Sequence, residues 1–200
     1  MSQIIEEILL DQSVNIIILN DKIMNDKVYG RKEIYIPIRE DVTRHIISYG
    51  LEPLSDSVHA TWYEIVFYKK EHPSINFDEV KEAILDDINS QTDEKILSGF
   101  VWTPIGGDPI NVWLSDENQR NYSEADRKAK DSPELVLPIT FKLGEDTDKN
   151  PVYYTFTTYE ELDGFYMQAF GYINQCLNEG WRRKDAIDWN DYSVFFPVTE

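Results

Sequence analysis

Cysteine is almost absent from this chain of 200 residues: Cys176 is the only one, so no intramolecular disulfide can form. Long hydrophobic runs are missing too, since the longest near-continuous apolar segment covers residues 14–19, far too few to cross a bilayer. The first residues, MSQIIEEILLDQ, contain three acids and no lysine or arginine, unlike the positively charged start of a signal peptide. We therefore expect the protein to be made, and to work or be assembled, in a cytoplasm.

Positive charge is scarce. The chain has 19 lysine and arginine residues against 37 aspartate and glutamate residues, which gives a formal net charge of -18 at pH 7. Such an acidic surface repels the phosphate backbone of nucleic acids and the anionic surface of membranes. We therefore expect neither a nucleic-acid partner nor a membrane partner. The simpler interpretation of this charge is that it keeps the protein soluble. The more specific interpretation is that the protein lines a channel through which DNA passes without binding.

Catalytic and cofactor motifs are also missing from the sequence. The three histidines, His45, His59 and His72, lack the spacing of metal ligands and lie far from Cys176 along the chain. Cys176 falls on the apolar face of a predicted helix, where a free cysteine usually belongs to the core. The sequence therefore predicts no catalytic residue, no metal site and no cofactor, and it favours a non-enzymatic role.

Two loops resemble ligand-binding motifs without completing them. Asp146, Asp148 and Asn150 have the alternate spacing of a calcium-binding loop, but Pro151 stands where that loop needs its glycine. Residues 106–109, Gly-Gly-Asp-Pro, follow a predicted strand, yet a strand follows them instead of the helix that a phosphate-binding loop requires. Both segments are better explained as hairpin turns.

Apolar residues are plentiful: 42% of the chain is hydrophobic and 13% is aromatic, which predicts a packed core. The pattern favours an α+β fold of small antiparallel sheets or hairpins with packed helices. In the N-terminal part, alternating isoleucines predict a strand over residues 32–38. Residues 40–49 have the apolar spacing of a helix that ends at Gly50, and residues 60–69 alternate as a long strand.

The polar segment around Pro73 predicts a domain boundary. We expect an N-terminal α+β docking region, residues 1–70, followed by a C-terminal domain, residues 71–200. Asn76 and Glu79 have the spacing of a capping box, which places the start of the first helix of the C-terminal domain at this point.

The C-terminal part repeats one geometry. Residues 109–115, PINVWLS, parallel residues 151–157, PVYYTFT, and each segment ends a hairpin and enters a helix through serine or threonine. We therefore predict that this part is built from two ββα units, with the second helix running from Thr158 to Gly180.

Several aromatic stretches follow one another in order over roughly residues 60–195: TWYEIVFYKK, DEVKEAILDDINSQTDEKILSGFVW, NVWLSDENQRNY, LPITFKLG, PVYYTFTTYEEL and LNEGWRRKDAIDW. They resemble a C-terminal domain of unknown function in phage and prophage virion-associated proteins of gut Bacteroidetes, some of them from crAss-like phages. The resemblance implies a virion setting, with assembly in the cytoplasm of a bacterial host, and a structural or binding role. It brings no catalytic residues with it.

The expected function is that of a non-enzymatic virion structural protein in the head–tail junction or neck, the tail or the fibre attachment. Its expected partners are other virion proteins and copies of itself. A soluble assembly chaperone or adaptor, absent from the mature particle, is the alternative, and a hydrolase is a third hypothesis. Candidate interface residues lie on an apolar stripe near the N-terminus and in a basic run near the C-terminus, namely Ile4, Ile5, Ile8, Leu9, Trp181, Arg182 and Arg183.

Deleting residues 2–12 tests the N-terminal stripe. A helix of eleven residues is marginal in water by itself, so something must cover its apolar side. We expect a neighbouring subunit to do so, and the shortened chain should then keep its circular dichroism and melting temperature while its assembly, followed by light scattering, weakens. Unfolding of the isolated monomer would instead show that this stripe belongs to the monomer's own core.

Overall fold

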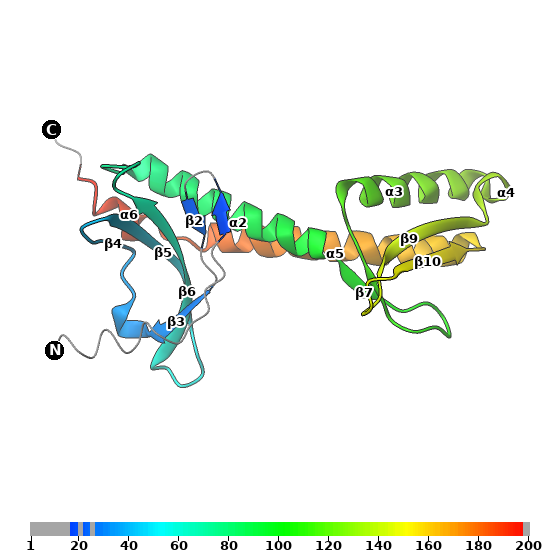
Figure 1. Ribbon diagram of the computed structural model, residues 1–200, viewed down its shortest axis with the longest axis horizontal. Coiled ribbons are helices and arrows are strands. Elements are labelled where there is room, and N and C mark those ends of the chain that lie inside the picture. The colour runs from blue at the N-terminus through cyan, green and yellow to red at the C-terminus, as the bar shows by residue number, and fades with distance from the viewer. Residues whose placement is uncertain (1–16, 20–21, 25–26, 198–200) are drawn as a thin grey trace. The chain divides into compact units, whose positions relative to one another are not determined.

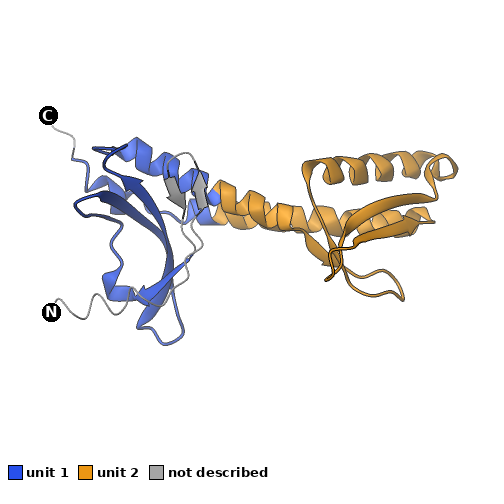
Figure 2. Cartoon of the chain, viewed as in Figure 1, with its two compact units in different colours: residues 1–88, 183–200 blue, residues 89–182 orange. Residues whose placement is uncertain are grey.

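The structure of the chain is a computed structural model that describes residues 17–19, 22–24 and 27–197. As predicted, the fold is α+β, with helices packed on small antiparallel sheets (Figure 1). The chain forms two compact units. Unit 1 contains residues 1–88 and 183–200, and unit 2 contains residues 89–182 (Figure 2). This division differs from the predicted boundary after residue 70, because the segment that follows residue 70 and the end of the chain both belong to unit 1.

Unit 1 is built around one antiparallel sheet. Its elements in chain order are β1 (Ile17–Leu19), β2 (Lys22–Met24), β3 (Val28–Arg31), the 3-10 helix η1 (Lys32–Ile34), β4 (Ile38–Glu40), β5 (Arg44–Pro53), β6 (His59–Tyr68), the first half of α2 (Phe77–Ser98), and α6 (Asn190–Ser193).

The long strands β5 and β6 form the centre of this sheet, whose order is β1-β2-β6-β5-β4. Strand β6 confirms the strand that was predicted over residues 60–69. Its outer edge pairs with β2 at residues 65–67 and with β3 at residues 59–62. The apolar core of the unit lies between one face of β5 and β6 and helix α2, and comprises Ile47, Tyr49, Ile65, Phe67, Val80, Ala83, Ile84, Ile88 and Tyr192.

The predicted helix over residues 40–49 is wrong, because most of this segment, residues 44–49, belongs to strand β5. All residues from 45 to 49 are buried. Ile47 and Tyr49 face α2, and the alternation of a strand turns Ile46 and Ser48 to the opposite face. A strand that is buried on both faces lacks polar alternation, so its apolar spacing imitates that of an amphipathic helix.

The predicted strand over residues 32–38 is wrong as well. Residues 32–34 form η1, and β4 begins only at Ile38. The isoleucines whose alternation suggested a buried face, Ile34 and Ile36, are 57% and 45% exposed. The predicted helix over residues 2–12 lies outside the described residues. Of the apolar segment over residues 14–19, only β1 is described.

Helix α2 begins where the capping box predicts. The amide of Asn76 donates to Oε2 of Glu79 at 2.7 Å, and the amide of Glu79 donates to Oδ1 of Asn76 at 3.0 Å. Each side chain thus satisfies a backbone donor that the first turn of the helix leaves open. The helix ends at Ser98, and Gly99 follows with φ of +79°.

Unit 2 contains the two predicted ββα units. Its elements after the second half of α2 are β7 (Phe100–Trp102), β8 (Ile110–Val112), α3 (Asp116–Asp131), α4 (Pro133–Val136), β9 (Ile139–Glu145), β10 (Pro151–Phe156) and α5 (Tyr159–Asp185). Strands β7 and β8 form one hairpin and strands β9 and β10 the other.

The two hairpins meet at a close approach of their backbones. The amide of Trp113 donates to the carbonyl of Leu143 at 2.8 Å. A Cβ on Gly144 would lie only 2.2 Å from the carbonyl oxygen of Asn111, so glycine is required here. The inner faces of both hairpins pack against helices around the ring of Phe165, which has three ring centroids 4.9–5.0 Å away, those of Trp102, Tyr122 and Phe156.

The last helix is longer than predicted, because α5 continues through Gly180 to Asp185. Gly180 is buried, and a Cβ on it would lie 2.5 Å from Oγ1 of Thr92 on α2. This glycine therefore allows two helices to pack closely and does not end one of them. Trp181 and Arg182 consequently belong to the last turns of the helix instead of following it.

Replacing Gly99 by alanine should destabilise the protein strongly. A Cβ at this position would lie 1.8 Å from the carbonyl oxygen of Val112, in addition to the positive φ. Gly106 is a matched control, since its φ is +73° but no atom lies within 4 Å of an added Cβ. In urea denaturation, Gly106→Ala should cost about 1 kcal/mol and Gly99→Ala on the order of 3 kcal/mol. Equal costs would mean that the backbone at Gly99 relaxes freely.

Candidate functional site

A pocket of about 310 Å³ lies in unit 1, between β5, β6 and the segment that follows α5. Four tyrosines line it, namely Tyr35, Tyr49, Tyr63 and Tyr192. The rings of Tyr49 and Tyr63 are stacked, with centroids 5.4 Å apart. Beyond Tyr49 the register of β5 against β6 shifts, and Gly50, with φ of +68°, lies in this bulge. The bulge bends β5 and so shapes one wall of the pocket.

Buried hydrogen bonds hold the tyrosine hydroxyls of this pocket. The Tyr49 hydroxyl donates to Oδ2 of Asp87 at 2.5 Å, and burial together with the charge of Asp87 raises the pKa of Tyr49. The hydroxyls of Tyr192 and Tyr35 donate to the carbonyl of Ser48 at 2.9 and 3.1 Å. Burial is the main reason why the pKa of each of these two tyrosines is raised. All three hydroxyls therefore stay protonated at neutral pH and serve as donors, not as general bases.

Both signs of charge occur at the pocket. The guanidinium of Arg183 lies 4.8 Å from the ring centroid of Tyr63, where a cation interacts favourably with the aromatic face. Glu52, Asp188 and Asp191 add carboxylates to the lining. Among the described residues that line the pocket, none is a histidine, cysteine, serine or lysine. The arrangement is suited to recognising a ligand or a side chain, and it offers no nucleophile with a base beside it.

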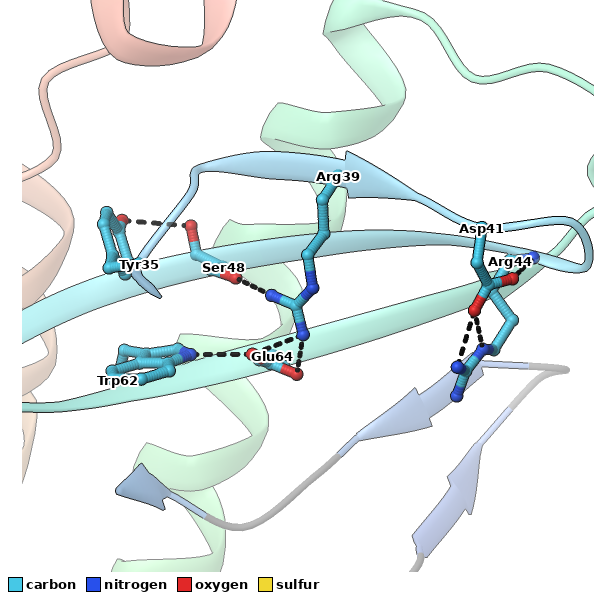
Figure 3. Close-up of polar contacts among 7 residues, drawn as sticks. All are labelled: Tyr35, Arg39, Asp41, Arg44, Ser48, Trp62 and Glu64. Carbon is cyan, nitrogen blue, oxygen red and sulfur yellow. Dashed lines mark hydrogen bonds and ion pairs between the residues drawn. The ribbon is translucent and has the colours of Figure 1, made fainter. Parts of the chain in front are cut away.

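A second polar constellation lies on the face of the sheet that points away from α2 (Figure 3). Nη2 of Arg39 on β4 donates to both carboxylate oxygens of Glu64 on β6, each at 2.9 Å. The indole of Trp62 donates to the same carboxylate at 2.7 Å, and Nη1 of Arg39 donates to Oγ of Ser48 on β5 at 3.1 Å. The side chain of Glu64 is only 10% exposed.

This network is a structural tie, meaning that its side chains link strands β4, β5 and β6 to one another. The carboxylate of Glu64 accepts three hydrogen bonds, and the arginine fork that holds it also reaches Ser48, so the three strands are linked through side chains as well as backbone. A buried carboxylate is tolerated when it is paired and bonded in this way. Its lone pairs are engaged, so it has little capacity left for a substrate.

The turn between β4 and β5 is held by one carboxylate. Asp41 accepts the backbone amides of Thr43 and Arg44, both at 2.8 Å, and forms an ion pair with the Arg44 side chain at 2.6 Å (Figure 3). The bond from Arg44, followed by the backbone bond from Thr43, holds the pKa of Asp41 well below its usual range. The turn is thereby fixed next to the strand that carries Arg39.

The candidate interface residues fall in different places. Trp181 and Arg182 are exposed on α5 in unit 2. Arg183 belongs to unit 1 and lies against the pocket tyrosine Tyr63. The four apolar residues of the N-terminal stripe, Ile4, Ile5, Ile8 and Leu9, lie outside the described residues.

The residues that sequence reasoning weighed for catalysis are not brought together within either unit. Cys176 is buried in the apolar core of unit 2. All three histidines belong to unit 1. Burial, and after it a hydrogen bond with Cys176, raises the pKa of Tyr172, so the thiol has a tyrosine as its polar neighbour.

The acidic loop that resembles a calcium site forms a hairpin turn. Oδ1 of Asp146 accepts the amides of Asp148 and Asn150 at 2.9 and 2.8 Å, so the carboxylate caps its own turn. Across the described ranges, no three histidine, cysteine or acidic side chains gather as metal ligands would. In the same part of the chain, no helix combines the length and apolar character needed to span a membrane.

Sequence reasoning missed the polar residues that the structure brings together in unit 1. Glu64 stands inside an otherwise apolar strand, TWYEIVFY, and Asp87 stands beside the apolar stripe of α2. An acid in such a position predicts a buried partner. The partner itself is not readable, because Arg39 lies 25 residues from Glu64 and Tyr49 lies 38 residues from Asp87.

Comparison with known proteins gives one match. Residues 79–196, more than half of the chain, match the model of a family described as a domain of unknown function, DUF4376. The match includes all of unit 2 and the segment after α5 that lines the pocket. It confirms the expected resemblance to a domain of unknown function. No curated protein and no solved structure matches the chain.

Replacing Glu64 by glutamine tests whether the Arg39 network is a structural tie. Glutamine keeps the shape but removes the charge and turns one acceptor into a donor that faces the guanidinium of Arg39. We expect a loss of about 1–3 kcal/mol in the free energy of unfolding. Glu52→Gln is the control, because Glu52 pairs with Lys27 while its side chain is 60% exposed, and that change should cost less than about 0.5 kcal/mol. Equal small effects in urea titrations followed by tryptophan fluorescence would contradict the role of the network.

Proposed function

This chain belongs to the DUF4376 family, and from that starting point we propose that it is a non-enzymatic structural protein of a phage virion that acts through protein–protein interfaces. Its place is the head–tail junction, the tail or the fibre attachment. Its partners are other virion proteins and copies of itself, without nucleic acid or membrane. It is assembled into the particle in the cytoplasm of the bacterial host.

The observation that carries this proposal is the outer face of the hairpins in unit 2. The inner face of these strands packs against the helices, and the outer face carries Val101, Asn111, Trp113, Thr140, Lys142, Tyr153 and Thr155. Three large apolar side chains on it, Val101, Trp113 and Tyr153, are 61%, 38% and 63% exposed. Lys142 is the only charged residue of the seven, and its ammonium lies 5.0 Å from the ring centroid of Trp113.

Such a face fits the chemistry of a protein interface. Interface centres are poor in charge and rich in tryptophan and tyrosine, because large rings contribute contact area at a low cost in conformational entropy. The chain carries a net charge of -18, yet no acidic side chain is among the seven of this face. The carboxylate of Glu145 reaches its edge, where it is paired with Lys142 at 3.2 Å. A partner protein can therefore approach it without meeting the repulsion that the rest of the surface would produce.

The pocket in unit 1 supports a binding role over a catalytic one. Tyr35, Tyr49 and Tyr192 have raised pKa values and hydroxyls engaged inside the protein. Arg183 stacks on the fourth tyrosine, Tyr63. These features favour recognition of a polar group by contact. The soluble assembly chaperone, the alternative reading, would use the same kinds of surface and differs in whether the chain stays in the particle.

The deciding experiment is mass spectrometry of purified particles of the phage that encodes the chain. We expect the chain at a fixed copy number in the mature particle. If the chain is present during assembly but absent from the finished particle, the assembly-chaperone hypothesis would replace this proposal. Its absence from both assembly intermediates and particles would remove the virion role altogether.

The double variant Trp113→Ala with Tyr153→Ala tests the outer face directly. Removing two aromatic anchors should lower incorporation into particles at least tenfold, since one such anchor contributes about 2 kcal/mol or more to binding. The circular dichroism of the purified variant should be unchanged, because both side chains point away from the core. Ile105→Ala is the control: Ile105 is 98% exposed in the loop between β7 and β8, outside this face, and its loss should leave incorporation unchanged.

A further inference from the structure

Helix α5 contains a stretch without charge that is unusual for this chain. From residue 164 to residue 178 there is no lysine, arginine, aspartate or glutamate, although 28% of the whole chain is charged. A solvent-facing helix normally carries charged residues on its outer side. Here the outer side instead carries exposed apolar residues, and Met167, Phe170 and Trp181 are 53%, 50% and 54% exposed.

Two of these three residues, Met167 and Trp181, belong to a seven-residue repeat along the outer side of the helix. One series is Gly164, Gly171 and Asn178, and the other is Met167, Asn174 and Trp181. The two series alternate at spacings of three and four, so they form one stripe along the helix. The stripe lies opposite the buried side of α5, which carries Leu162, Phe165, Ala169 and Cys176.

A seven-residue repeat is the pattern with which one helix packs along another. Large side chains enter gaps in the partner helix, and this stripe contains both kinds of position. Trp181 and Met167 are large and exposed. Gly164 and Gly171 leave gaps, since an added Cβ at either would have no atom within 4 Å apart from its chain neighbours and the nearby backbone of its own helix.

Within one chain nothing in the described residues fills these gaps, and the repeat fits a second copy in antiparallel orientation. In that register Gly164 faces Trp181 of the other copy, Met167 faces its Asn178, and Gly171 faces its Asn174. Each large residue then meets a small or polar one. The same stripe can therefore supply both sides of the contact, as a two-fold symmetric dimer requires.

Charge selects the antiparallel orientation over the parallel one. Acids stand before the uncharged stretch, with Glu161 flanking the stripe, and Arg182 flanks it at the other end. Antiparallel helices bring Glu161 of one copy next to Arg182 of the other at both ends, whereas parallel helices would bring like charges together. Glu160 and Asp185, the next positions of the repeat, are both acidic, so the contact ends at Gly164 and Trp181.

We propose that the outer face of α5, from Gly164 to Trp181, binds the same face of a second copy of this chain as an antiparallel helix pair. The inference deepens the proposed function, because it names the surface for one of the partners proposed there, and it uses a different face from the hairpins. The contact is about 27 Å long, from 18 residues at 1.5 Å each. An interface of this length belongs to the small class, so the dissociation constant should be roughly micromolar.

Gly171→Glu is the sharpest variant against this dimer. It places a carboxylate in the middle of the contact in both copies, and the open space around Gly171 means that the monomer should fold as before. Gly171→Ala is the control, because it makes the same backbone change without the charge. In sedimentation velocity over a concentration series, the unaltered chain and Gly171→Ala should pass from monomer to dimer, and Gly171→Glu should weaken dimerisation at least tenfold.

Cysteine pairs test the orientation. The only native cysteine, Cys176, is buried and should not react. Met167→Cys and Asn178→Cys are placed on separate chains, which are then mixed and oxidised. The antiparallel register predicts a disulfide between the two variants and none within Met167→Cys alone, where the two residues would be about 16 Å apart along the axis. Self-linking of Met167→Cys would show a parallel pair and overturn the register.

A chain that stays monomeric at every concentration, or a dimer unaffected by Gly171→Glu, would overturn the proposal. Neither result would bear on particle incorporation through the hairpin face, because that is measured by mass spectrometry of particles and by the Trp113 and Tyr153 variant. Conversely, absence of the chain from particles would leave the dimer intact. The two proposals therefore fail independently.

Discussion

The pairing of β5 with β6 is the contact on which the rest of unit 1 depends. Both strands are buried on both faces, so their register decides which residues meet α2 and which meet the polar network. Tyr49 faces α2 and reaches Asp87, while its neighbour Ser48 points the other way, opposite Glu64, and receives Arg39. A slip of one residue would turn the Glu64 carboxylate into the apolar core, at a large cost in free energy.

Two outer surfaces of unit 2 contain few charged residues. The outer face of the hairpins has one lysine among seven residues, and the outer face of α5 has no charge over residues 164–178. In a chain with a net charge of -18, acids would oppose contact wherever two copies or two subunits meet. The acids lie elsewhere on the surface, and we propose these two faces of low charge as the ones used in assembly.

Parts of the candidate site could be anticipated and others could not. The aromatic content indicated a packed core, and the acid inside the apolar strand β6 was a signal of a buried partner that sequence reasoning did not use. The pocket could not be predicted, because it needs a bulge in β5 and residues from the segment after α5, more than 120 positions apart in the chain. Arg183, grouped by sequence with Trp181 and Arg182, lies against Tyr63 instead.

The sequence by itself determined the start of α2 and the two ββα units, because a capping box or a hairpin turn depends on residues a few positions apart. Only the tertiary structure decided that residues 44–53 form a strand and that α5 continues through Gly180. The spacing of apolar residues over 44–53 and the glycine at position 180 are each compatible with two local structures. Burial on two faces of a sheet gives helix-like spacing, and a glycine can either end a helix or let Thr92 of another helix come close. The neighbours that resolve each case come from distant parts of the chain.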